Sequence, residues 1–252
     1  MPDTYVSMVL LTAGLLAELV LLYLISRILI EHLYAFFFLI LHSRTVAVSL
    51  VTFLTFPGTV IHELSHLFTA EILGVRTGGL TLTPEAIQEP EVRAGSVMIA
   101  HTDPFRRTII GTAPFYTGIV SLTALSYYFT PQVVATWNAL VAGAGVTPGP
   151  FILLLGIIYL MFAVSNSMFS SKEDMKGFPV VAIFVALIIT TLYLIGVRIS
   201  LTGRVESFAN QVLVSLTQSL GIVLALNIVL LLMTRFLIVL TGKITNRRII
   251  PR

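Results

Sequence analysis

The stretch TVAVSLVTFLTFPGTVIHELSHLFTAEIL, residues 45–73, decides the fold class of this chain. A helix that crosses a lipid bilayer needs about 20 consecutive, mostly apolar residues, and this stretch supplies them. Near its end stand His62, Glu63 and His66 in the pattern H-E-x-x-H. Ionisable side chains inside a membrane helix are costly, so they need polar partners or a wet cavity and mark candidate functional sites. We therefore expect a chemical site within the membrane.

The composition of the whole chain indicates the same class. Of its 252 residues, 56% are hydrophobic and only 11% are charged, with a mean hydropathy of +0.97. Soluble domains carry about 25% charged residues, so a water-soluble globular protein is not expected, and neither is a disordered chain. The chain has no cysteine, which excludes disulfides, thiol catalysis and cysteine-ligated metal centres. An all-α polytopic membrane protein remains, as a single membrane-embedded domain over residues 1–252.

Six apolar stretches are predicted to be transmembrane helices. They cover residues 5–30, 45–73, 108–129, 151–168, 178–197 and 211–240. The apolar run 33–41 is too short to cross alone and is expected to extend the next helix or lie at the interface. The segment 76–104 is polar, contains Gly and Pro, and predicts a small β hairpin or sheet after the H-E-x-x-H helix. Residues 131–150 are rich in Gly and Pro and predict a loop.

The positions of the basic residues predict the orientation in the membrane. With both chain ends in the cytoplasm, eleven of the 15 Lys and Arg residues face the cytoplasm, including those of a basic tail at 243–252. The positive-inside rule favours this distribution. The other four are Arg27, Arg44, Arg198 and Arg204. Because the basic residues stand at the ends of apolar spans, the net charge of +3 indicates membrane topology rather than nucleic-acid binding.

The H-E-x-x-H pattern has a direct chemical interpretation. On a helix, His62 and His66 lie four residues apart and share one face, so both imidazoles can bind one zinc ion. Zinc lowers the pKa of its water to about 7, and Glu63 can then act as general base and later protonate the leaving amine. The alternative is a helix-packing cluster in which the histidines bond to Ser65 and to backbone groups. That alternative explains the polarity of the segment but not the spacing.

Two histidines do not complete a catalytic zinc site, which usually has three protein ligands and one open position. The sequence offers four further candidates: Glu71, His101, Asp103 and Asp174. Glu71 follows His66 by only five residues, so the helix would have to bend sharply to bring it to the metal. His101 and Asp103 belong to the polar segment and could fold back. Asp174 follows the fourth predicted span, where a solvated loop acid beside two lysines is the competing interpretation.

These motifs resemble those of the site-2 protease class of intramembrane zinc metalloproteases. In that family H-E-x-x-H lies in one transmembrane helix, and the third ligand is an Asp in a later helix, usually within N-x-x-P-x-x-x-x-D-G. Asn166 and Asp174 stand at the same separation of eight, but Phe169 replaces the usual Pro and Met175 the usual Gly. The resemblance covers residues 45–180. The chain therefore looks like a divergent, minimal branch with no PDZ-like or CBS-like domain.

The resemblance implies a function and a set of roles. His62, His66 and Asp174 would hold one Zn²⁺ per chain, and Glu63 would be the catalytic base. Asn166 would lie near the site and hold the substrate backbone or the tetrahedral oxyanion, which needs a donor placed at the developing charge. The implied activity is hydrolysis of peptide bonds in transmembrane protein substrates within or beside the lipid bilayer.

A different class of protein is the alternative. A transporter or channel for metal ions or protons would also carry His, Glu and Asp inside the membrane, because intramembrane ionisable residues mark ion paths. Inverted repeats would favour a transporter, and the sequence shows none.

Two further expectations concern access to the site. Pro57 and Gly58 are predicted to kink or unwind the helix before His62, which would admit water and substrate, although they are also common in transmembrane helices. A strand of the polar segment offers an edge for an extended substrate.

Overall fold

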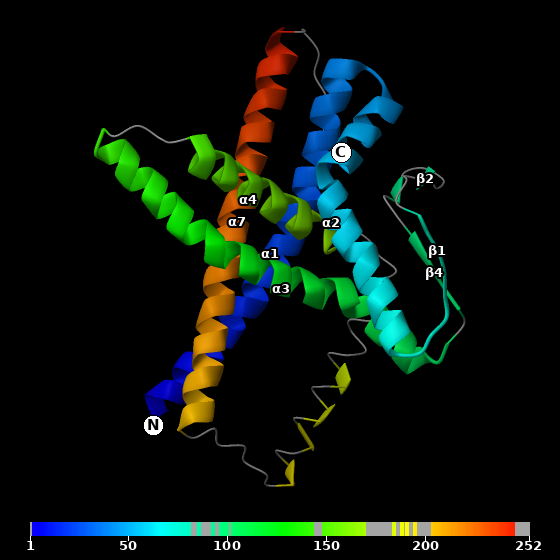
Figure 1. The fold of residues 1–252 in the computed structure, drawn as a ribbon, viewed down its shortest axis with the longest axis vertical. Helices are drawn as coiled ribbons and strands as arrows, with labels where there is room; N and C mark the ends of the chain where they lie inside the picture. Colours follow the sequence, from blue (N-terminus) through cyan, green and yellow to red (C-terminus); the bar gives the residue numbers. More distant parts are fainter. Residues whose placement is uncertain are drawn as a thin grey trace.

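The computed structural model describes residues 2–81, 85–86, 92–93, 96–100, 102–143, 148–169 and 203–244, with four residue pairs between 183 and 195. Within these parts the chain is almost entirely helical (Figure 1). Five of the described helices are long and apolar enough to cross a membrane. They are α1 (Pro2–Leu41), α2 (Arg44–Ile72), α3 (Pro104–Val141), α4 (Pro148–Ser167) and α7 (Arg204–Ile244). The predicted span 178–197 lies mostly outside the described residues.

The first helix is longer than predicted. The run 33–41 continues α1 instead of extending the next helix or lying at the interface, so α1 contains 40 residues. The run has neither Gly nor Pro, and nothing in it stops a helix that has already formed. The chain turns at His42, which has a φ of 55°. Ser43 then caps α2 by accepting a hydrogen bond from the backbone N–H of Val46.

The predicted loop 131–150 is wrong in its first half. Helix α3 continues through Pro131 and ends at Val141. A proline inside a helix removes one backbone hydrogen bond, but the ten residues that follow contain no Gly or Pro and keep the helix going. The stop comes at Gly143, whose φ of 67° is the left-handed conformation common just after helix ends.

Four short strands lie in the polar segment: β1 (Thr77–Thr81), β2 (Glu85–Ala86), β3 (Val92–Arg93) and β4 (Ser96–Ile99). β1 pairs antiparallel with β4, and β2 pairs antiparallel with β3. The chain leaves α2 for β1 through Gly74, at φ 68°, with the N–H of Val75 bonded to the carbonyl of Ala70 at 2.8 Å. This is the Schellman pattern of helix termination. It brings β1 and β4 against the end of α2 (Figure 1).

Helices α1 and α7 form a parallel pair. Glu18 lies at Gly221, and further along both helices Arg235 Nε donates to His32 Nε2 at 3.2 Å. Residue numbers therefore increase in the same direction along both helices, as Figure 1 also shows. A topology with both chain ends on one face needs the first and last spans to run in opposite directions, so the observed pair differs from that expectation. In that expectation the direction of the last span depends on the span 178–197, which lies mostly outside the described residues.

The apolar core lies where α1, α3, α4 and α7 meet. Its fully buried residues include Leu22 of α1, Leu122 of α3, Met161 of α4 and Leu220 of α7. The backbones of α2 and α4 come close together at Gly58. A Cβ on Gly58 would overlap the carbonyl oxygen of Ala163 and the hydroxyl of Ser167. Gly58 therefore serves the contact between two helices, while Pro57 stands within the continuous helix α2.

A side chain at position 58 is expected to destabilise the protein. Gly58→Ala should lower the stability by about 1–3 kcal/mol, because the added carbon meets backbone atoms of α4 that cannot turn away. Gly58→Val should lower it further. Thermal unfolding in detergent measures the effect. Gly156→Ala on α4 is the control, since a Cβ there meets no atom within 4 Å. Equal unfolding temperatures for Gly58→Ala and Gly156→Ala would contradict the close packing.

Candidate metal centre

The buried face of α2 is made of small and polar residues. They are Ala47, Thr52, Thr55, Gly58, Thr59, His62, Glu63, Ser65, His66 and Ala70. Thr55 and Thr59 each donate to the carbonyl four residues earlier, so their hydroxyls are satisfied within the helix. His62, Glu63 and His66 are only 4%, 6% and 6% exposed. The three residues of the motif thus face the neighbouring helices and not the lipid.

The two histidines meet through their outer ring nitrogens. His62 Nε2 and His66 Nε2 are 3.3 Å apart, and the rings are nearly perpendicular, at 81°. Two nitrogens bound to one tetrahedral zinc ion at about 2.0–2.1 Å would be separated by about 3.4 Å. The spacing of the two Nε2 atoms therefore fits a pair of zinc ligands.

The orientation of His66 is set by α3. Its Nδ1 lies 2.8 Å from the carbonyl oxygen of Ile110, a residue that is 1% exposed. A carbonyl can only accept, so Nδ1 carries the hydrogen and Nε2 directs its lone pair toward His62. Metal-bound histidines are commonly held in this way by a backbone carbonyl. No sequence pattern predicts this contact, because any residue at position 110 offers a carbonyl.

The helix-packing alternative also accounts for part of this geometry. Ser65 donates its hydroxyl to the carbonyl of His62 at 2.6 Å, and His66 bonds to backbone. In the present structure the two Nε2 atoms are also within hydrogen-bond distance of each other. Packing alone, however, does not require the Nε2 atoms of two imidazoles to lie 3.3 Å apart, with a buried glutamate directly after the first of them in the chain.

The third ligand is not found among the described residues. Asp174 and His101 lie outside them, and within the described ranges no group of three His, Cys, Asp or Glu side chains is placed to hold a metal ion. Glu71 is exposed at the end of α2. Of the four candidates, only Glu71 and Asp103 can therefore be located, and neither stands with the histidines in such a group.

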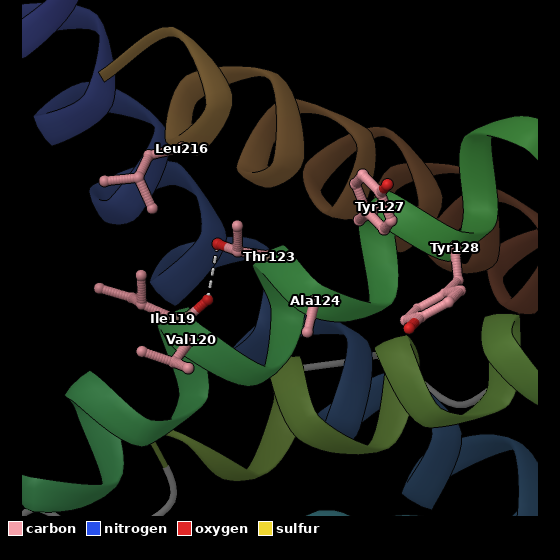
Figure 2. Close-up of a pocket in the computed structure, with 7 residues that line it drawn as sticks. All are labelled: Ile119, Val120, Thr123, Ala124, Tyr127, Tyr128 and Leu216. Carbon is pink, nitrogen blue, oxygen red and sulfur yellow. Dashed lines mark hydrogen bonds between the residues drawn. The ribbon is translucent and has the colours of Figure 1, made fainter. Parts of the chain in front are cut away.

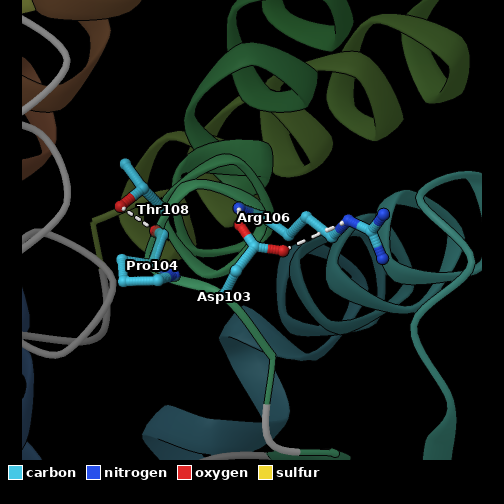
Figure 3. A network of polar contacts seen from close by, with 4 residues as sticks. All are labelled: Asp103, Pro104, Arg106 and Thr108. Atoms are coloured by element: carbon cyan, nitrogen blue, oxygen red, sulfur yellow. Dashed lines mark hydrogen bonds and ion pairs between the residues drawn. The ribbon is translucent and has the colours of Figure 1, made fainter.

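Asp103 has a structural role at the start of α3 (Figure 3). Its Oδ1 accepts a hydrogen bond from the backbone N–H of Arg106 at 3.0 Å, and its Oδ2 lies 3.3 Å from Arg106 Nε. The backbone hydrogen bond, with help from the guanidinium charge, lowers the pKa of Asp103 below its usual range. Asp103 is therefore the N-cap of α3, which accounts for an ionised carboxylate at this position.

Asn166 lies in α4 and is bonded away from α2. Its Oδ1 accepts from Ser26 of α1 at 2.8 Å, and its Nδ2 donates to Asn227 of α7 at 2.8 Å. Sequence reasoning did not single out Asn227 or Ser26. A signal for Asn227 was present, because an amide inside the last apolar span is as unusual as the histidines of α2.

A described cavity lies away from the two histidines. A groove of about 510 Å³ lies between α3 and α7, lined by Ile119, Val120, Thr123, Ala124, Tyr127, Tyr128 and Leu216 (Figure 2). The Thr123 hydroxyl, one of its few polar groups, donates to the carbonyl of Ile119 in the same helix. Because this groove is apolar and contains no residue of the H-E-x-x-H motif, we do not assign the chemistry to it.

Comparisons with other proteins do not place the chain in a family. No protein-family model matches it, and neither the characterised proteins nor the solved structures include a significant match. The functional argument therefore depends on the residues of this chain.

Proposed function

We propose that this protein is an intramembrane zinc metalloprotease that hydrolyses peptide bonds of membrane-protein substrates. The observation that carries the proposal is the 3.3 Å separation of the two Nε2 atoms, buried within an apolar helix and next to a buried glutamate. Two imidazoles and a carboxylate in this arrangement are the parts that metal-assisted peptide hydrolysis requires.

Asp174 is the third ligand in this proposal, with His62 and His66. The contacts of Phe169, just after α4, support this role. The ring of Phe169 is 6.1 Å from that of Phe115 on α3. Five residues of helix, about 7.5 Å of rise, separate Phe115 from Ile110, whose carbonyl binds His66. The five residues from Phe169 to Asp174 can extend over about 17 Å, which is sufficient to reach the histidines.

Each residue of the proposed site has its own role in the reaction. When bound, zinc supplies a Lewis acid for the substrate carbonyl and lowers the pKa of its water to about 7. Ile110 holds the His66 ring so that Nε2 faces His62. Glu63, 6% exposed, takes the proton from the attacking water and gives it to the departing amine nitrogen. The burial of the site keeps bulk water away from these charges, which strengthens their interactions.

The same proposal includes an orientation in the membrane. We place the face that carries β1, β4 and the start of α3 in the cytoplasm, because Arg76, Arg106 and Arg107 stand there.

Reconstitution into lipid vesicles tests the proposed function. The purified protein is expected to cut co-reconstituted single-span peptides, with new termini found by mass spectrometry. Cleavage should stop when a zinc chelator is added and resume when zinc is restored. A zinc-sensitive dye inside the same vesicles measures transport in parallel. Zinc entry without any cleavage would contradict the protease proposal and support the transporter alternative.

A further inference from the structure

Four buried polar side chains join α1, α4 and α7. Ser26, Ser165, Asn166 and Asn227 are each at most 7% exposed. Asn166 Nδ2 donates to Asn227 Oδ1 at 2.8 Å, and Asn227 Nδ2 donates back to Ser165 Oγ at 2.9 Å. Ser26 donates to Asn166 Oδ1 at 2.8 Å. We call these four residues the amide cluster. In an apolar surrounding, such bonds between helices fix which faces meet.

The amide cluster uses every donor that the two asparagines have. An amide nitrogen carries two hydrogens. Asn166 Nδ2 also donates to the carbonyl of Phe162 at 2.8 Å, and Asn227 Nδ2 also donates to the carbonyl of Val223 at 3.1 Å. Asn166 would have to break one of these buried bonds before donating to a substrate carbonyl or oxyanion. A direct contact with substrate is therefore unfavourable for Asn166.

The same part of α4, together with Met168 directly after it, contacts both helices that form the candidate metal centre. Ala163 and Ser167 pack against Gly58 of α2, one helical turn before His62. Met168 lies against Gly118 of α3, where a Cβ would come within 2.9 Å of the Met168 Cβ. Gly118 is two turns beyond Ile110, whose carbonyl holds His66. A rotation or a shift of α4 would therefore displace both helices of the site.

We propose that Asn166 and Asn227 are positioning residues that fix the rotation and depth of α4, and through Gly58 the placement of His62, Glu63 and His66. Asn166 is not a substrate contact in this arrangement. The consequence for catalysis rests on the proposed function, while the consequence for the structure of α2 does not. Removing Asn166 leaves the buried Asn227 Oδ1 without its donor. Removing Asn227 takes an acceptor from Asn166 Nδ2 and a donor from Ser165 Oγ. In either case α4 rotates to relieve the loss.

Hydrogen exchange of the full chain in detergent tests the structural part without any metal. Asn227→Leu, Asn166→Leu and the double variant are each expected to raise amide exchange in residues 59–67 of α2 about threefold to tenfold. The double variant should exceed neither single variant, because the two side chains act as one unit. Thr234→Val is the matched control, since Thr234 is a buried polar residue of α7 that bonds to its own helix.

Metal binding and kinetics test the catalytic part. The visible spectrum of bound Co²⁺ should change in both single variants and not in Thr234→Val. For a fluorogenic single-span peptide, kcat should fall about tenfold with KM within twofold, since interhelical bonds of this kind hold the site and not the substrate. Asn227→Ser, which keeps a polar group but shortens it, replaces Asn227→Leu if that variant does not fold.

The outcomes separate this inference from the proposed function. Unchanged exchange in residues 59–67 of Asn227→Leu overturns the inference. The inference is also overturned if Asn166→Leu changes only KM while Asn227→Leu has wild-type kinetics. That result would make Asn166 a substrate contact. Raised exchange in a protein that binds neither Zn²⁺ nor Co²⁺ supports the positioning role and contradicts the proposed function.

Discussion

Glu63→Gln is expected to keep one zinc ion per chain and to lower peptide cleavage by about 10²–10⁴-fold, the range typical for removing a general acid or base. Glutamine has nearly the shape of glutamate but cannot take a proton from water. The side chain is 6% exposed, so no bulk base can replace it readily. The measurement is the cleavage rate per zinc-loaded protein in lipid vesicles.

Glu71→Gln is the matched control for this variant. Glu71 lies on the same helix but is exposed near its end, so its substitution should leave cleavage within twofold of wild type. Cleavage by Glu63→Gln at the rate of the control would remove Glu63 from the mechanism. Loss of zinc from Glu63→Gln would instead give this carboxylate a role in holding the metal.

The second large effect is expected in the metal content. Wild-type protein should carry about one zinc ion per chain, and both His62→Ala and Asp174→Ala should lose it, because a zinc site of this type needs three protein ligands. Elemental mass spectrometry of the detergent-purified protein measures the ratio. Asp103→Asn and Glu71→Gln should retain the metal, since Asp103 caps α3 and Glu71 is exposed.

The pattern of loss identifies the ligands. Zinc lost from His62→Ala but kept in Asp174→Ala would move the third ligand to His101, since neither Glu71 nor Asp103 stands with the histidines in a metal-binding group. A wild-type protein without bound metal would contradict the zinc site altogether and favour the transport alternative.

The fold could be predicted from sequence wherever hydrophobicity alone decides the structure. Helix α2 was predicted as 45–73 and spans Arg44–Ile72, because apolar length, the Ser43 cap and Gly74 all agree. The predicted loop 131–150 gave too much weight to a single residue. A loop that begins at Pro131 is wrong, because a proline removes only one backbone hydrogen bond and the ten residues after it contain no Gly or Pro.

Some features of the candidate site could also be predicted from the sequence, and others could not. The spacing of His62 and His66 predicts a shared face, and the structure brings their Nε2 atoms together. The carbonyl of Ile110 and the amide of Asn227 could not be assigned, because each meets its partner through packing between helices far apart in the chain. The local sequence determines which side chains share one face of a helix. Which groups of other helices those side chains contact depends on the tertiary arrangement.

The unequal lengths of the helices have a consequence for the surrounding lipid. The apolar part of α1 has 32 residues, or about 48 Å, while α4 has 20 residues, or about 30 Å. The hydrocarbon core is about 30 Å thick, so α4 fits it upright, and α1 fits only if it tilts or the bilayer thickens around it. Because α7 is parallel to α1 and packs along it, the two must tilt as one body. This tilt, or a local thickening of the bilayer, takes up the extra length on the side of the α1–α7 pair. Bilayer thickness should therefore shift how the pair leans against α2, the helix that carries His62 and His66.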